Sequence, residues 1–180
     1  MKISNILKVI GLLLVVLLFW GAYVSFINPS SPRGSSKLNK DTLIMEVDYS
    51  RPFKKERLIF GESSEKALVP FNNYWRLGAN FATTFETNES ISFAGRMIEP
   101  GKYRMYAVPS KDSWKITLNT DAGAFGYIEP DYNNDLISIN VSSKQMTEMI
   151  EQLTIDFIDD NLGTALRIRW DSTLVLIPLD

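Results

Sequence analysis

Arginines, aromatic rings and polar side chains that could bind a small ligand lie close together between Tyr49 and Phe85. The candidate binding residues are Tyr49, Arg51, Arg57, Tyr74, Trp75, Arg76, Asn80 and Thr83. A guanidinium group binds carboxylates and phosphates through paired hydrogen bonds, and an aromatic face stacks on sugars or planar molecules. This stretch therefore predicts a site for a small anionic or carbohydrate ligand. We expect Arg51, Arg76 and Asn80 to converge in one cavity or groove.

The competing interpretation of the same residues is structural. The arginines would then pair with nearby acids (Glu46, Asp48 or Glu86), and the rings would close one end of the domain. Because opposite charges pair readily across neighbouring strands, this interpretation needs no ligand at all.

The composition removes most catalytic chemistry. The chain has no histidine and no cysteine, which excludes histidine-based triads and the usual ligands of zinc and copper. A carboxylate pair remains, because Glu46 and Asp48 share one face of a predicted strand about 6.6 Å apart, within the range that glycosidases use. Glu86 is a third candidate, but a solvated outer face explains these acids more simply. We assign no catalytic residue, no metal site and no cofactor, and the chain is more simply a binding protein than an enzyme.

One acidic segment imitates a metal-binding loop. Asp131-x-Asn133-x-Asp135 has the spacing that opens a calcium loop. Its sixth position is Leu136 instead of glycine, and its twelfth is Ser142 instead of glutamate. We therefore predict a turn at this segment.

Apolar and polar residues alternate with a period of two through most of the chain after residue 42, which is typical of half-buried strands. The predicted strands cover 43–49, 81–86, 90–93, 102–108, 114–119, 136–141, 166–171 and 173–178. Turn residues separate them, so we expect an all-β domain at 42–180, an antiparallel β-sandwich of jelly-roll-like form. Met146, Met149 and Ile150 fall at helical spacing, which predicts one helical turn before a strand that starts near Gln152.

The N-terminal segment is apolar and uncharged from Val9 to Ile27. Nineteen helical residues would reach about 28 Å, close to the roughly 30 Å of a bilayer core. We predict a short cytoplasmic tail (1–8), a transmembrane signal anchor (9–27) and a flexible linker (28–41). A cleaved signal peptide is the alternative, but its apolar region would run only about 7–15 residues. The exported domain, preceded by one transmembrane helix, is therefore expected in the periplasm as part of a single-pass membrane protein.

Charge limits the partners. The formal net charge is −2, and the part after Thr42 is acidic overall. Nucleic-acid binding needs a positive surface that displaces counterions, so no nucleic acid is expected. The expected partners are the membrane through the N-terminal helix, and a small anionic or carbohydrate ligand or an envelope protein.

Several short motifs follow one another in a fixed order. They are Tyr-Ser-Arg-Pro (49–52), Arg-x-Ile-Phe-Gly (57–61), Leu-Val-Pro (68–70), Trp-Arg-x-Gly-Ala-Asn (75–80), Pro-Gly-x-Tyr (100–103), Trp-x-Ile-x-Leu-Asn (114–119), Leu-x-Ile-x-Trp (166–170) and Val-x-Ile-Pro (175–178). From about Thr42 to Pro178 the chain resembles the bacterial family known as domain of unknown function 2911. The resemblance implies a β-rich exported protein and carries no activity. Phe81 departs from the small or acidic residue expected before Ala-Thr-Thr, and the apolar N-terminal run is longer than the family's simple signal peptide.

These observations leave three function hypotheses. The first is a membrane-anchored extracytoplasmic module of the bacterial envelope that binds a ligand or a partner. The alternatives are a structural scaffold in an envelope complex and a carboxylate-dependent hydrolase that acts on envelope glycans. A cavity lined by the candidate residues would favour binding over scaffolding, and a carboxylate pair inside that cavity would favour the hydrolase.

Overall fold

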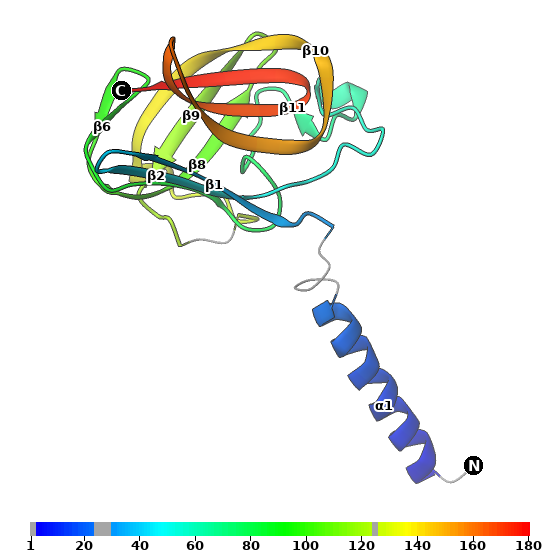
Figure 1. Ribbon diagram of the computed structural model, residues 1–180. Helices are drawn as coiled ribbons and strands as arrows, with labels where there is room; N and C mark the ends of the chain where they lie inside the picture. The colour runs from blue at the N-terminus through cyan, green and yellow to red at the C-terminus, as the bar shows by residue number, and fades with distance from the viewer. Residues whose placement is uncertain (1–2, 24–29, 124–125) are drawn as a thin grey trace. The chain divides into compact units, whose positions relative to one another are not determined.

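The computed structural model describes residues 3–23, 30–123 and 126–180. The chain divides into two compact units, Met1–Pro32 and Arg33–Asp180. The first unit contains the helix α1 (Ile3–Ala22), and the second contains the strands (Figure 1).

The first unit overturns the predicted localisation. The uncharged part of α1 runs only from Val9 to Ala22, about 21 Å at about 1.5 Å per residue, whereas a bilayer core is about 30 Å thick. Among the residues that the structure describes, none of the helices is both long and apolar enough to cross a membrane. The prediction of a single-pass membrane protein is therefore wrong. Residues 24–29, which include the end of the predicted anchor and the start of the predicted linker, lie outside the described residues.

The second unit is mostly antiparallel β-sheet. In the part of the chain that the structure describes, its large sheet has nine strands in the order β1 (Arg33–Lys40), β2 (Leu43–Ser50), β5 (Thr83–Thr87), β8 (Gly101–Pro109), β9 (Ser113–Asn119), β10 (Asp135–Asp160), β11 (Gly163–Leu179), β6 (Ile91–Phe93) and β7 (Arg96–Ile98). A small parallel pair joins β3 (Phe60–Gly61) to β4 (Val69–Pro70). Among the described residues, 3-10 helices lie at Ser63–Glu65 and Tyr132–Asn134.

Strand β10 joins the two parts of the large sheet. Its first part pairs with β9 as far as Ser142, and the rest pairs with β11 from Ser143 onward. Figure 1 shows the long β10 ribbon, yellow to orange, curving across the domain between these partners. Between Gln145 and Ile150 the pairing shifts, so that residues 146–149 oppose Ser172 alone. The predicted helical turn is therefore wrong, because this stretch is a bulged strand.

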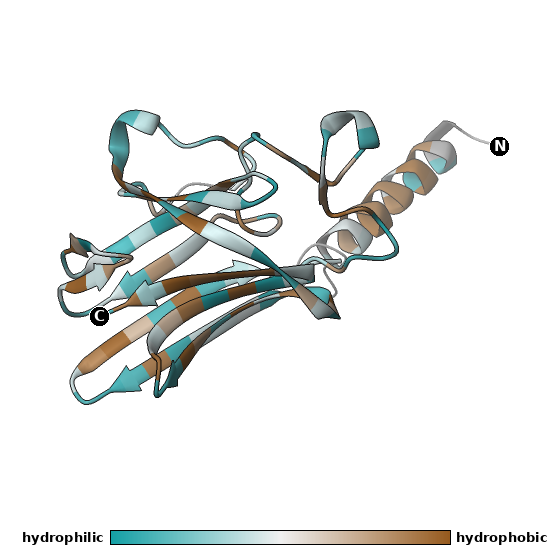
Figure 2. Ribbon diagram, turned by 90° about the horizontal axis from the view of Figure 1, so that it is seen from above, coloured by the Kyte–Doolittle hydropathy of each residue, from teal (hydrophilic) through white to brown (hydrophobic). Residues whose placement is uncertain are grey.

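The predicted alternation places apolar side chains on the inner face of the strands. Figure 2 shows apolar and polar bands succeeding one another along them. Phe85, Met105 and Ile116, on three neighbouring strands, are each fully buried. Four rings close one side of this core, with centroids 5.0–6.1 Å apart: Phe60, Trp75, Trp114 and Trp170.

The predicted strands each overlap an observed one, so the all-β antiparallel prediction is confirmed; the sandwich or jelly-roll form remains a prediction. The strands β1, β3, β4 and β7 were not predicted. Of these, β1 lies inside the predicted linker and pairs along its whole length with β2, from Arg33 opposite Ser50 to Lys40 opposite Leu43. Its short polar and lysine side chains suit a strand at the edge of a sheet. The compact unit therefore begins at Arg33 and not at Thr42.

Candidate functional site

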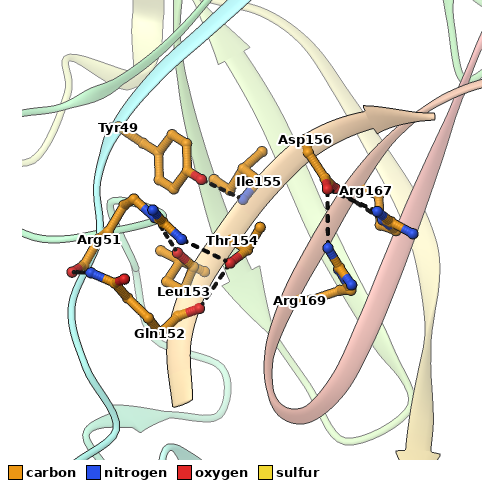
Figure 3. Close-up of polar contacts among 9 residues, drawn as sticks. All are labelled: Tyr49, Arg51, Gln152, Leu153, Thr154, Ile155, Asp156, Arg167 and Arg169. Carbon is orange, nitrogen blue, oxygen red and sulfur yellow. Dashed lines mark hydrogen bonds and ion pairs between the residues drawn. The ribbon is translucent and has the colours of Figure 1, made fainter. Parts of the chain in front are cut away.

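Tyr49 and Arg51 hold the second part of β10 by its outer backbone edge (Figure 3). The Tyr49 hydroxyl accepts a hydrogen bond from the Ile155 N–H at 2.8 Å. Arg51 Nε donates to the Leu153 carbonyl and its Nη2 donates to Thr154 Oγ1, both at 3.2 Å. Because β11 pairs with the opposite edge of β10, these bonds satisfy backbone groups that the sheet leaves unpaired. Tyr49 and Arg51 therefore form a structural clamp.

The clamp depends on a glycine in β1. A Cβ atom on Gly34 would lie 2.4 Å from Cδ of Arg51, so only glycine lets the arginine stem pass. Burial raises the pKa of Tyr49, and the Ile155 N–H opposes that effect without cancelling it. The hydroxyl therefore stays protonated at neutral pH.

Three other candidate residues make only local structural contacts in the described part of the chain. Arg57 Nε donates to the Lys54 carbonyl at 2.9 Å, which ties this exposed side chain to its own loop. Trp75 is 6% exposed within the ring cluster. Thr83 is fully buried and its hydroxyl donates to the Leu77 carbonyl at 2.9 Å.

Within the described ranges, three arginines rest on aromatic rings. The pairs are Arg33 over Phe81, Arg76 over Tyr127 and Arg104 over Tyr74, with 5.6, 5.5 and 5.9 Å between the guanidinium carbon and the ring centroid. In the described part of the chain, none of these arginines forms an ion pair with a carboxylate. A ring face attracts a cation but leaves the N–H groups at its edge open for hydrogen bonds. We call these six residues the arginine–aromatic site.

Two loops bring the site together. The loop before β5 lies against the loop after β9, because a Cβ atom on Gly126 would lie 2.6 Å from the backbone nitrogen of Ala82 and 2.8 Å from the Asn80 carbonyl oxygen. The Tyr74 hydroxyl also reaches the Gly126 carbonyl, at 3.5 Å. The close approach requires a glycine at position 126, and it places Asn80 beside the site.

Arg104 is the most unusual member of the site. This side chain on β8 is 1% exposed. Its Nη2 donates to the Tyr74 hydroxyl and to the Ile128 carbonyl. Its Nε and Nη1 have no hydrogen-bond partner among the described residues. Burying a cation without a counter-charge costs several kcal/mol, roughly, even after the protein relaxes, so an anion that reached these donors would be bound strongly.

A cavity of about 410 Å³ lies on the outer face of the sheet next to neighbours of Arg104, which does not itself line it. It is lined by Arg33, Asp48, Phe81, Ala82, Thr84, Lys102, Ala122 and Gly123. Thr84 is directly opposite Arg104 in the β5–β8 pairing, and Lys102 lies on the same face of β8. Lys102 Nζ is 3.2 Å from Glu86 and 3.9 Å from Asp48. Arg33, Lys102 and the neighbouring Arg104 together outnumber these carboxylates, so this end of the outer face favours an anion.

A polar network lies next to Arg104, which is opposite Asn119 in the β8–β9 pairing. The Tyr106 hydroxyl donates to Asp135 at 2.7 Å, and Asn119 Nδ2 donates to the same carboxylate at 2.8 Å. Burial, with this bond to Asp135, raises the pKa of Tyr106 well above its usual value. Asp131 caps a 3-10 helix by accepting from the Asn133 N–H at 3.0 Å, which confirms the predicted turn. Across the three described ranges, clusters of three or more acidic side chains placed to hold a metal ion are not found.

The eight predicted binding residues therefore separate. The structure brings Tyr74, Arg76 and Asn80 to the arginine–aromatic site and assigns the rest to the clamp, a local loop and the core. Of the three residues expected to converge, Arg51 contacts β10 instead.

Sequence reasoning missed Arg33 and Arg104. The available signal was on β8, where Lys102, Arg104 and Tyr106 alternate with buried Tyr103 and Met105. That alternation indicates an outward face, but the loops that cover Arg104 are set by tertiary structure.

Comparison with protein families gives one match. The family model described as "Protein of unknown function (DUF2911)" matches residues 31–179. Searches of curated proteins and of solved structures found no match. The matched range covers β1 to β11, which is the whole strand-forming unit.

Proposed function

The chain belongs to the DUF2911 family of proteins of unknown function, and from this premise we propose that it is a binding module for a small anionic ligand, held at the arginine–aromatic site. The family's description names no activity, so the proposal depends on one observation. Arg104 is 1% exposed, and its Nε and Nη1 donors have no partner among the described residues. A carboxylate or phosphate offers the paired oxygens that such a fork binds.

The surroundings of Arg104 support a ligand of metabolite size. The adjacent cavity of about 410 Å³ lies within the range of about 300–1,000 Å³ that is usual for small-molecule sites. Arg33 and Lys102 add positive charge to its wall, and the Phe81 ring adds an apolar surface. A carboxylate or phosphate bound to a small organic group fits this combination of charge and apolar contact.

The proposed architecture is a β-sandwich in which β10 folds the two parts of the large sheet onto each other. Ring contacts between the parts support this. Phe85 on β5 lies 5.3 Å from Phe93 on β6 and 6.3 Å from Phe157 on β10, measured between ring centroids. In such a sandwich the inner faces of the two sheet parts pack against each other. The cavity on the outer face would then lie on a rigid, packed sheet.

A thermal-shift titration of the full chain tests the proposed function. The probes are inorganic phosphate, succinate and citrate, each added at constant ionic strength. A ligand that binds only the folded state stabilises it by about 2.7 kcal/mol at a hundred times its Kd. We expect a saturable rise in Tm with at least one probe in the wild type and no rise in Arg104→Met.

Arg57→Ala is the matched control, because Arg57 is exposed and bound to its own loop. It should keep the full ligand-dependent shift. The same loss in both variants, or no shift in the wild type with any of the three anions, would reject the proposal.

A further inference from the structure

We propose a second binding site, for a neutral carbohydrate, in a different cavity of about 480 Å³. This cavity lies between the β3–β4 segment, the β8–β9 turn and the bulged part of β10 and β11. It shares no lining residue with the cavity beside Arg104. The proposal is therefore independent of the proposed anion site.

The bulge in β10 creates the space. Residues 146–149 oppose Ser172 alone. Their side chains therefore do not occupy the positions that a regular strand would give them beside β11. Asp171 adopts a left-handed backbone conformation at φ 53°, which turns β11 at the same point. Opposite the bulge, a Cβ atom on Gly61 would lie 2.9 Å from Glu65 Oε2, so the glycine lets the β3 segment pass close to the 3-10 helix. Backbone features on both sides thus keep the cavity open.

Aromatic side chains form one wall. Phe60, Phe71 and Trp114 all line the cavity. The Phe60 ring is held 5.0 Å from Trp114 and 5.5 Å from Trp75, between centroids, so its orientation is fixed by the core. Fixed aromatic faces bind the C–H side of a sugar ring, because they offer apolar area at little entropic cost.

Polar and charged groups form the other wall. Gln145 and Ser172 line the cavity, and their side chains make no hydrogen bond within the described part of the chain. Asp171 has one oxygen 2.9 Å from Lys54 Nζ and a second that can accept. An amide, a hydroxyl and a carboxylate can both donate to and accept from the hydroxyl groups of a sugar.

Charge favours a neutral ligand here. The Lys54 ammonium offsets the Asp171 carboxylate. Glu65 Oε2 already accepts the Glu62 backbone N–H at 2.8 Å. Lys111 is the cation that lines the cavity, against three carboxylates, so an anion is disfavoured. Hydrogen-bonding groups that face fixed rings, in a lining where carboxylates outnumber the cation Lys111, match a neutral carbohydrate better than an anionic metabolite.

Tryptophan fluorescence of the full chain tests this site, because Trp114 lines the cavity. The probes are glucose, N-acetylglucosamine and their β-1,4-linked dimers at millimolar concentration. We expect a saturable change with at least one sugar in the wild type. Gln145→Ala should weaken that binding about tenfold, as expected when a hydrogen-bonding partner of the ligand is lost.

Two variants control for indirect effects. Lys144→Ala alters the neighbouring exposed residue, which does not line the cavity, and should bind as the wild type does. Arg104→Met should also leave sugar binding unchanged, so a failure here is distinct from a failure of the anion site. No response to any sugar, an equal loss in Lys144→Ala, or a response to choline in place of the sugars would overturn the proposal.

Discussion

Replacing Arg104 by methionine distinguishes two interpretations of its guanidinium group. In the first the group lacks hydrogen-bond partners until an anion binds, and in the second the fold already satisfies it. Methionine keeps the apolar stem and removes the charge and every N–H donor. The change sacrifices two hydrogen bonds, to Tyr74 and Ile128, each worth about 1.5–3 kcal/mol because the donor is charged. It also removes the unbonded donors on Nε and Nη1, each of which costs about 1–3 kcal/mol or more.

The loss of the two hydrogen bonds and the removal of the unbonded donors are of similar size and opposite sign. Removing the buried charge stabilises the variant by a further several kcal/mol, roughly. We therefore expect the ligand-free variant to be between equally stable and about 3 kcal/mol more stable than the wild type. Gain of stability with loss of ligand binding is the combination that a buried binding group should show.

Urea unfolding of the full chain, followed by tryptophan fluorescence in a buffer without polyvalent anions, measures the difference. Arg167→Met is the matched control, because Arg167 donates to both oxygens of Asp156, at 2.9 and 2.8 Å. That variant should lose about 1 kcal/mol. If Arg104→Met instead loses about 3–5 kcal/mol, as when one partner of a buried pair is removed, the guanidinium is already satisfied and our reasoning about it fails.

Three further predictions concern the clamp and its neighbours. Tyr49→Phe leaves the buried Ile155 N–H without an acceptor and should lower the free energy of unfolding by about 1–3 kcal/mol in urea; an unchanged midpoint would contradict this. Gly34→Ala should displace Arg51 and cost about 1 kcal/mol in the same assay, and the loss should vanish in an Arg51→Ala background. Burial opposes ionisation of Asp156, but its two arginine partners outweigh it and hold its pKa below the usual value. Its stabilising contribution is thus present above about pH 4 and is lost as the pH falls through the lower folded pKa, so urea stabilities of wild type and Asp156→Asn should differ at pH 7 and converge in acid.

The strand pattern was predictable because burial imposes it locally. In β9, Trp114, Ile116 and Leu118 alternate with polar residues, and a half-buried strand needs nothing more. β1 has no such signal: Ser35, Ser36 and Lys37 read as a linker, and only pairing with β2 makes them a strand. The stabilisation from that pairing depends on the residues of β2, so the sequence of β1 alone does not indicate a strand.

The site was predictable only in part, for the same reason. Residue type indicated that arginines and rings at 49–85 would meet, and Arg76 and Tyr74 do contact rings or a guanidinium. The partners lie far away in the sequence, since Tyr127 and Arg104 come from the second half of the chain. Arg51 could not be assigned in advance, because a guanidinium binds a backbone carbonyl as readily as a ligand.

The clamp on β10 has a consequence for how the chain folds. Strands β8 to β11 are neighbours in sequence as well as in the sheet, so their contacts close short loops. Arg51 meets Thr154 across a separation of 103 residues, and contacts of this kind form late because the chain between them must be ordered first. Loss of the clamp should therefore speed unfolding far more than it slows folding. The Tyr-Ser-Arg-Pro segment would then determine how long the native state persists.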